Sequence, residues 1–163
     1  MIFITVGSEY PFDRLIRAMD ELIENGVIQT GVFAQIGHGR YLPRNMGWAE
    51  TITRSAFEKK VADASGVIAH AGMGTILSCL KAQKPLLVVP RLKKYGEIVS
   101  DHQVATAKKF ESLNYLLAAY DEKDLSAKVD QLRSFSPPRF QHGSSGVIER
   151  VRRFLEGLSD SGR

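Results

Sequence analysis

Residues 66–90 read GVIAHAGMGTILSCLKAQKPLLVVP and predict most of the architecture by themselves. A short apolar run, VIA, leads straight into a glycine-containing turn at residues 70–75, HAGMGT. An amphipathic segment with helical spacing follows, and Lys84-Pro85 ends it. Residues 86–89 then have the composition of a second buried strand. The segment therefore predicts a strand, a glycine turn, a helix and another strand, in that order.

The turn after the first of these strands has the chemistry of an anion site. Gly72 and Gly74 allow backbone N–H groups to approach a ligand closely, and the next helix offers the positive end of its dipole. A phosphate or diphosphate would fit there. Two glycines are equally what a tight strand-to-helix turn needs without any ligand. The pattern by itself leaves both interpretations open.

Composition places the chain among soluble globular proteins. Its 163 residues predict one domain, and 44% hydrophobic with 25% charged residues is ordinary. A net charge of +4 permits an anionic ligand or a negatively charged membrane surface, but it is too small to indicate nucleic acid. The one cysteine, Cys79, excludes an internal disulfide and is expected to be a buried apolar residue.

No run of apolar residues approaches the roughly 20 that a membrane span needs. The N-terminal MIFITVG has no basic region and no cleavage site of a signal peptide. No Cys/His cluster has the spacing of metal ligands, so no metal site is predicted. These features predict a cytoplasmic chain that reaches a membrane only through a partner or a surface patch.

The rest of the chain repeats the alternation of strands and helices. Ser55 is predicted to cap the second helix, with Glu58 completing a capping box, and Ser100 or Asp101 to cap the fourth. Polar loops are expected at residues 40–47 and 91–100. Strands are expected at residues 2–6, 32–36, 51–53, 67–69, 86–89 and 115–118, and helices that contain residues 12–23, 56–64, 76–80, 104–110, 124–132 and 146–158.

Short, almost wholly apolar strands that alternate with helices indicate a parallel sheet covered on both faces. The predicted fold class is α/β, a Rossmann-like doubly wound sheet. In such sheets ligands bind beyond the carboxyl ends of the strands. Gly7-Ser8, Gly37-His38, residues 70–75 and Arg91 all follow predicted strands, so they are expected to meet at one cleft.

Several of these side chains have both a functional and a structural interpretation. His70 could donate to a phosphate oxygen or orient the turn, or it could be a satisfied structural histidine. The Thr75 hydroxyl could bind a ligand or only cap the helix. Gly7 and Ser8 repeat the strand-to-glycine geometry and could supply further N–H donors, or form a plain turn.

The segment after the last apolar strand of the central unit offers polar and basic groups. Asp101 and Gln103 together suit hydrogen bonds to vicinal sugar hydroxyls, although Asp101 could be only an N-cap. Arg91, Lys93 and Lys94 could bind an anionic group, face a partner, or be solvated. The cluster of Arg91, Lys93 and Lys94 favours an acidic sugar in the ligand.

Common catalytic motifs are missing from the sequence. There is no G-x-S-x-G segment, so a serine hydrolase of that type is not indicated. There is also no P-loop and no G-x-G-x-x-G run, because Leu77 stands at the third position after Gly74. A nucleoside triphosphatase and a dinucleotide-dependent dehydrogenase are therefore not predicted.

Four blocks of sequence, in this order, resemble the glycosyltransferase family 28 C-terminal domain. They are MIFITVGSEYPFDRLIRAMDEL, FAQIGHG, VIAHAGMGTILSCLKAQKPLLVVPR and YGEIVSDHQ, and the resemblance covers roughly residues 1–135. Within that family the chain is similar to the small donor-binding subunits of two-component bacterial exopolysaccharide and capsule glycosyltransferases. Those in turn are similar to the catalytic subunit of the dolichol-linked N-acetylglucosaminyltransferase.

The resemblance implies a GT-B half-domain that binds a UDP-sugar and transfers the sugar with inversion, without a metal or other cofactor. By position, it implies that residues 54–57 meet the uracil and that Gly7 and Ser8 approach the diphosphate from the first strand. Asp101 and Gln103 would hold sugar hydroxyls. The residues implied to line the diphosphate itself are His70, Gly72, Met73, Gly74 and Thr75.

One position departs from the family. Many relatives carry an acidic residue on the helix after the glycine turn, where it can bind ribose hydroxyls, and this chain has Ser78 there. A serine can make one such bond, so the ribose contact and the preference for UDP are less firmly implied.

The resemblance also implies a partner. Inverting transfer needs a general base, which in two-domain GT-B enzymes usually belongs to the N-terminal domain. The chain is too short to contain that domain, so a membrane-anchored subunit is expected to supply the base and the site for a polyprenyl-diphosphate-linked acceptor. Residues 136–145 are predicted to be a linker, and the amphipathic helix in residues 146–163 is expected either to dock the partner or to fold back.

Two other classes remain open. One is a nucleotide-sugar hydrolase or epimerase that acts alone, for which Glu9 and Glu97 are the candidate bases. The other is a non-catalytic subunit that only binds a nucleotide sugar.

Overall fold

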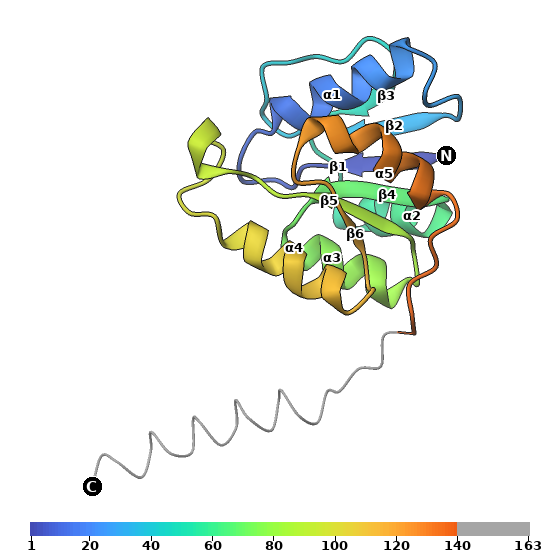
Figure 1. Cartoon of the computed structure of the whole chain (residues 1–163). Coiled ribbons are helices and arrows are strands. Elements are labelled where there is room, and N and C mark those ends of the chain that lie inside the picture. Colours follow the sequence, from blue (N-terminus) through green and yellow to red (C-terminus); the bar gives the residue numbers. More distant parts are fainter. Residues whose placement is uncertain (140–163) are drawn as a thin grey trace, which may run out of the picture.

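The computed structural model describes residues 1–139 and shows one sheet with helices on both faces (Figure 1). Strands and helices alternate along the chain, as the apolar periodicity predicts. In chain order they are β1 (Ile2–Thr5), α1 (Asp13–Glu24), β2 (Val32–Gln35), β3 (Gly47–Ala49), α2 (Arg54–Asp63), β4 (Gly66–His70), α3 (Met73–Lys81), β5 (Leu86–Val89), the 3-10 turn η1 (Lys93–Tyr95), α4 (His102–Ser112), β6 (Leu117–Ala118), the 3-10 turn η2 (Glu122–Asp124) and α5 (Leu125–Leu132).

The sheet has the strand order β3-β2-β1-β4-β5-β6, and every pair is parallel. β1 lies between β2 and β4, with Ile4 opposite both Ala34 and Ile68. The chain therefore winds outward from β1 in one direction and, from β4 onward, in the other. This is the Rossmann-type doubly wound order, and the predicted fold class is confirmed.

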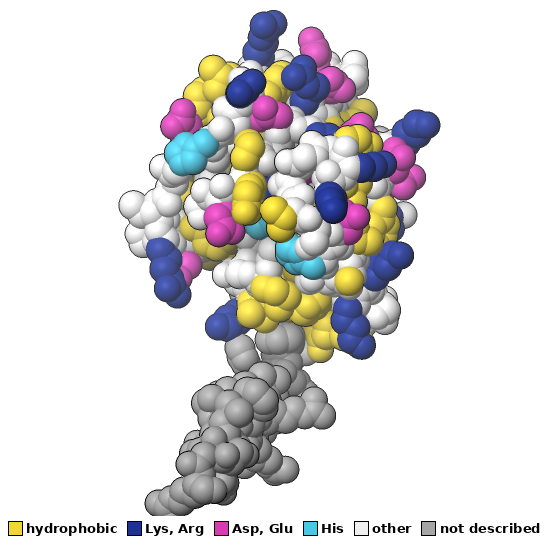
Figure 2. Space-filling view, turned by 90° about the vertical axis from the view of Figure 1, so that its left-hand side faces the viewer, with side chains coloured by type: hydrophobic (Ala, Val, Ile, Leu, Met, Phe, Trp, Pro, Cys, Tyr) yellow, Lys and Arg dark blue, Asp and Glu magenta, His cyan; other side chains and the backbone are white. Residues whose placement is uncertain are grey.

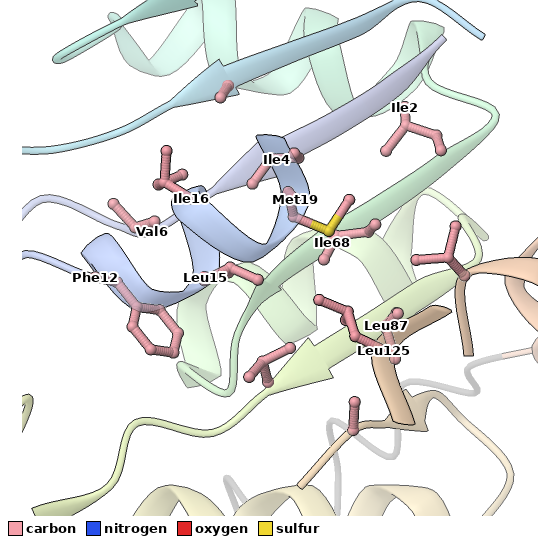
Figure 3. Close-up of a cluster of buried hydrophobic side chains, with 14 of the residues drawn as sticks. Ile2, Ile4, Val6, Phe12, Leu15, Ile16, Met19, Ile68, Leu87 and Leu125 are labelled. Atoms are coloured by element: carbon pink, nitrogen blue, oxygen red, sulfur yellow. The ribbon is translucent and has the colours of Figure 1, made fainter. Parts of the chain in front are cut away.

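Two apolar layers hold the helices on the sheet. On one face, α1 and α5 pack on β1, β2, β4 and β5 through side chains such as Leu15, Ile16 and Val129 (Figure 3). On the other face, α2, α3 and α4 pack through Val61, Ile76 and other buried side chains. Because both faces are covered, all four residues of β1 and of β5 are buried. The uniformly apolar strands predict this arrangement.

The third strand and the second helix begin earlier than predicted. The expected strand at residues 51–53 is wrong: the strand is β3, whose Gly47 and Ala49 pair with Phe33 and Gln35. The expected cap Ser55 is also wrong, because the Thr53 hydroxyl accepts the Ala56 N–H at 3.2 Å. No capping box forms around Ser55.

The later elements lie where the sequence predicts them, although the strand expected at residues 115–118 is only Leu117–Ala118. Asp101 occupies the N-cap position of α4, but its side chain makes no capping hydrogen bond there.

No helix within residues 1–139 is long and apolar enough to cross a membrane. The helix predicted at residues 146–158 and most of the predicted linker lie outside the described residues.

Candidate functional site

A cleft of about 1010 Å³ opens at the carboxyl ends of the strands. These ends lie on the left of Figure 1, and Figure 2 looks onto that edge, where histidine and apolar side chains lie near the middle of the face. The loops that follow β1, β3, β4 and β5 all contribute to the cleft, as expected for the carboxyl edge of such a sheet. Gly37 and His38, which were also expected there, do not line it. Of the residues predicted to bind a ligand, those that line it are Gly7, Ser8, His70, Gly72, Gly74, Thr75, Ser78, Arg91 and Gln103.

His70, the last residue of β4, lies between two glycines. A Cβ built on Gly72 would be 2.2 Å from Nε2 of the His70 ring, and a Cβ built on Gly7 would be 2.8 Å from its Cε1. Gly7 also has φ +76°, a conformation that residues with a side chain rarely adopt. The two glycines therefore leave room for the imidazole between the β1 and β4 turns.

The surroundings of His70 favour the neutral ring. Burial and the nearby Arg91 cation lower the pKa of His70 to about 4, against a smaller opposing effect of the Thr5 carbonyl. Nδ1 is the buried ring nitrogen and makes no hydrogen bond of regular geometry within residues 1–139. At neutral pH, a neutral imidazole can donate one hydrogen bond to an anion and keeps its own charge out of the buried site.

Gln35, which the sequence reasoning missed, fixes the turn after β1. Its Oε1 accepts the Gly7 N–H at 3.2 Å and the Thr5 hydroxyl at 2.7 Å, and its Nε2 donates to the carbonyls of Gly7 and Glu50 at 2.9 Å each. The Gly7 N–H therefore points to Gln35 rather than to a ligand. The sequence signal was one polar residue at the end of an otherwise apolar strand.

The N-terminus of α3 faces the cleft without a side-chain cap. Gly72 is the N-cap residue, and Gly74 and Thr75 in the first turn line the cleft. The first N–H groups of a helix have no partner inside it, and the helix dipole adds positive potential at the same place. This end of α3 can therefore accept an anionic group from its backbone alone.

Arg91 adds a buried positive charge. Its side chain is 3% exposed, and its Nη2 donates to the carbonyls of Val6, at 2.7 Å, and of Tyr10. Within residues 1–139 its guanidinium makes no ion pair, and Nε has no hydrogen-bond partner. Burial lowers the pKa of Arg91 from its usual value. Glu97 and Glu9 are near enough to favour the charged form, but neither forms an ion pair with the buried guanidinium, so an anion in the cleft would offset more of the cost of burying it.

The other residues predicted to bind a ligand divide into two groups. Gln103 is buried in the cleft, where its Oε1 accepts a hydrogen bond from the backbone N–H of Arg91 at 3.0 Å. Its amide nitrogen is the group left for a ligand. Asp101 and Met73 do not line the cleft. The Asp101 carboxylate accepts a hydrogen bond from the backbone N–H of Lys93 at 2.8 Å, and the Met73 side chain is exposed. Lys93 and Lys94 are exposed and also lie outside the cleft lining.

The two candidate bases behave differently. Glu97 is not in the cleft lining, because Arg14 holds both of its oxygens, at 2.7 and 2.9 Å. Its Oε2 also accepts the Leu92 N–H at 2.9 Å. Glu9 is exposed, lines the cleft and makes no ion pair within the described residues. Glu9 is therefore the carboxylate of this pair that could meet a ligand.

The cleft lining also includes apolar side chains, those of Ile52, Phe57 and Leu77. The exposed ion pair between Arg54 and Glu58 lines the cleft as well. Planar rings stack well on such surfaces. The cleft thus has a polar, cationic part around His70 and an apolar part around α2. No group of three or more His, Cys, Asp or Glu side chains in residues 1–139 is placed to hold a metal ion.

Comparisons with known proteins agree with this geometry. A family model described as the glycosyltransferase family 28 C-terminal domain matches residues 1–156. The UDP-N-acetylglucosamine transferase subunit ALG13 of Candida albicans is 33% identical over 94 residues, which make up 58% of this chain and 30% of that protein. The matched segment thus spans less than a third of that relative's length.

Solved structures show the same fold. The NMR solution structure of ALG13 aligns with a TM-score of 0.60 at 21% identity, and the match covers 92% of this chain and 93% of that one. The crystal structure of the glycotransferase of kitacinnamycin also has a TM-score of 0.60, at 20% identity. There the match covers 82% of this chain and 34% of that one. At these identities the structural likeness shows the fold alone.

Proposed function

Because the chain belongs to the glycosyltransferase family 28 C-terminal domain family, we propose that it is the donor-binding catalytic subunit of an inverting glycosyltransferase. Its donor is a UDP-sugar, from which a hexose is transferred. The acceptor is a polyprenyl-diphosphate-linked sugar in exopolysaccharide or capsule synthesis. The observation that carries the proposal is the uncapped N-terminus of α3, which faces a cleft containing the unpaired Arg91 cation.

The diphosphate fits the polar part of the cleft. Backbone N–H groups of the first turn of α3 would donate to its oxygens, and neutral His70 would donate one more hydrogen bond. Arg91 would supply long-range attraction, because its Nη2 is already bonded to the chain. The uracil would lie against Ile52 and Phe57 in the apolar part.

The same groups would lower the barrier of the transfer. As the glycosidic bond to the diphosphate breaks, negative charge grows on the leaving UDP. Fixed dipoles and a fixed cation stabilise that charge without reorganising, so the proposed reaction needs no metal ion. The Gln103 amide is available to a hydroxyl of the donor sugar.

A partner subunit is part of the proposal. The Candida albicans relative is named a subunit of a transferase, which supports an enzyme of more than one chain. We therefore expect a heterodimer in which a membrane-anchored subunit supplies the acceptor site and the general base. The chain itself would be peripheral at the cytoplasmic face of the membrane, with residues 146–163 as the candidate docking segment.

Glu9 supports an alternative. A carboxylate that lines the cleft without an ion pair could serve a hydrolase or epimerase that acts on a nucleotide sugar without a partner. The non-catalytic alternative, a nucleotide-sugar-binding subunit, would use the same cleft.

Calorimetry with UDP and a panel of UDP-sugars tests the binding part of the proposal and identifies the sugar. Transfer to a polyprenyl-diphosphate-linked acceptor is then measured for the chain alone and together with the product of a neighbouring gene. We expect UDP-sugar binding by the chain alone and transfer only with the partner. Strong transfer or hydrolysis by the isolated chain would contradict the half-enzyme interpretation, and absence of UDP binding would contradict the proposal as a whole.

A further inference from the structure

Arg14 and Glu97 form a largely buried ion pair next to the cleft but outside its lining. The Arg14 Nε lies 2.7 Å from Oε1 of Glu97, and its Nη2 lies 2.9 Å from Oε2, so the contact is bidentate. The two side chains are only 14% and 9% exposed. The pair therefore ties the first turn of α1 to the segment between β5 and α4.

The same two side chains hold the backbone on both sides of Arg91. The Arg14 Nη2 donates to the Pro90 carbonyl at 3.2 Å, and the Glu97 Oε2 accepts the Leu92 N–H at 2.9 Å. These two groups belong to the peptide bonds that precede and follow Arg91 in the chain. The ion pair therefore fixes the backbone from which the Arg91 side chain enters the cleft lining.

The Phe12 ring is a second link between the two arginines. The guanidinium carbons of Arg14 and Arg91 each lie 5.1 Å from its centroid, and the ring is 1% exposed. Both distances are within the range of a cation–π contact. A displacement of Arg14 would therefore disturb a buried ring that the Arg91 guanidinium also contacts.

A gain in stability is a weak explanation for an ion pair of this kind. Taking two charges out of water is costly, and their mutual attraction often does no more than offset that cost. Bidentate geometry does give the contact a definite direction as well as a distance. The Arg14–Glu97 pair is therefore well suited to hold the groups bonded to it in place, and those groups flank Arg91.

We propose, resting on the proposed function, that Arg14 is a positioning residue for the phosphates of the ligand. It makes no contact with the ligand itself. Through Glu97 and Pro90 it holds the Arg91 backbone, so that the Arg91 cation stays directed at the anion site. Loss of Arg14 should therefore weaken the binding of the phosphates of a nucleotide and leave the binding of the nucleoside intact.

The test measures the dissociation constants of UDP and of uridine by calorimetry on the full chain. In Arg14→Met we expect the preference for UDP over uridine to fall about tenfold, with the affinity for uridine within about twofold of the wild-type value. An unchanged preference, or equal losses for the two ligands, overturns the inference and leaves the proposed function standing. Absence of UDP binding by the wild-type chain removes both.

A double-mutant cycle shows whether Arg14 acts through Arg91. In an Arg91→Met background the cation is already gone, so adding Arg14→Met should change the remaining preference for UDP by less than about twofold. A merely structural role of Arg14, or a direct contact between Arg14 and the phosphates, would give the same loss with and without Arg91. That additive result overturns the assignment.

A conservative variant keeps the inference testable if Arg14→Met does not fold. Arg14→Lys retains the positive charge, but an ammonium group lacks the fixed fork that holds both Glu97 oxygens, so the preference for UDP should fall at least about threefold. An unchanged preference in Arg14→Lys overturns the inference.

Lys128→Met is the matched control for the loss of a cation from an ion pair. Lys128 is also partly buried and pairs with Glu111 at 3.6 Å, but neither residue lines the cleft. The preference of this variant for UDP over uridine should equal that of the wild type. A loss as large as that in Arg14→Met would show that breaking any such pair has this effect, and would overturn the inference.

Discussion

The backbone of Gly72 lies directly against the His70 ring, so that a Cβ at position 72 would be 2.2 Å from Nε2 and 2.8 Å from Cδ2. The N-cap residue of α3 and the last residue of β4 are thus packed with no space for a methyl group. This contact joins the candidate anion site to the histidine beside it.

Gly72→Ala is expected to displace the His70 ring or the start of α3. We expect a loss of about 1–3 kcal/mol in the free energy of unfolding, the usual cost of overpacking a filled site, and at least tenfold weaker UDP binding. Gly31→Ala is the matched control, since nothing lies within 4 Å of a Cβ there. Urea unfolding and calorimetry measure both quantities. Equal behaviour of the two variants would contradict the contact.

Gly7→Ala separates backbone strain from the contact with His70. Gly7 and Gly26 have similar φ angles, +76° and +72°, but only a Cβ on Gly7 would meet the His70 ring. Both alanine variants should lose about 1–2 kcal/mol from the left-handed conformation. Gly7→Ala should lose more than Gly26→Ala and should also weaken UDP binding. If Gly26→Ala destabilises the protein as much, the ring contact contributes nothing.

The protein should become less stable as the pH is lowered, because His70 is held neutral in the folded state. Because the pKa of His70 is lowered to about 4 in the folded protein and is near 6.5 when unfolded, the unfolded chain binds the proton first as pH falls below 6.5. The loss should reach about 2 kcal/mol at pH 5 and should be absent above pH 7. His70→Asn should remove this part of the pH dependence, whereas His38→Asn, at an exposed position, should keep it. Parallel pH profiles for wild type and His70→Asn would show that His70 is not held neutral.

Arg91 should contribute more to the binding of the phosphates than to the binding of the base. Arg91→Met removes the buried cation and leaves the Val6 and Tyr10 carbonyls without their donor. We expect a loss of about 1–3 kcal/mol in the free energy of unfolding and a larger drop in affinity for UDP than for uridine. Lys93→Met, at an exposed cation outside the cleft lining, should change neither. Equal losses for UDP and uridine would place Arg91 away from the diphosphate.

The sequence predicts the layers and the position of the cleft because buried parallel strands are uniformly apolar and their ends share one edge. It does not predict β3, since Gly47–Ala49 is a three-residue edge strand without an apolar pattern. It also places the cap of α2 at Ser55 rather than Thr53, because both hydroxyl residues suit the role.

The contacts within the site are less predictable, because they depend on partners distant in sequence. Gln35 occupies the Gly7 N–H from 28 residues away, and Arg91 reaches Val6 across 85. The local pattern shows a glycine turn after β1 and a basic residue after β5. It does not show that the Gly7 N–H points to Gln35 or that Arg91 is buried. Asp101 is similar: its position fits a ligand, while its carboxylate is bonded to the Lys93 N–H.

The central claim is that backbone amides at the start of α3 bind the diphosphate of a nucleotide. Amide NMR spectra of this 18.1 kDa chain, recorded during titration with UDP and separately with uridine, test it most directly. We predict large shifts of the Met73, Gly74 and Thr75 amides with UDP and small shifts of the same amides with uridine. If UDP leaves these three amides unmoved while shifting others, the anion site lies elsewhere and the account is wrong.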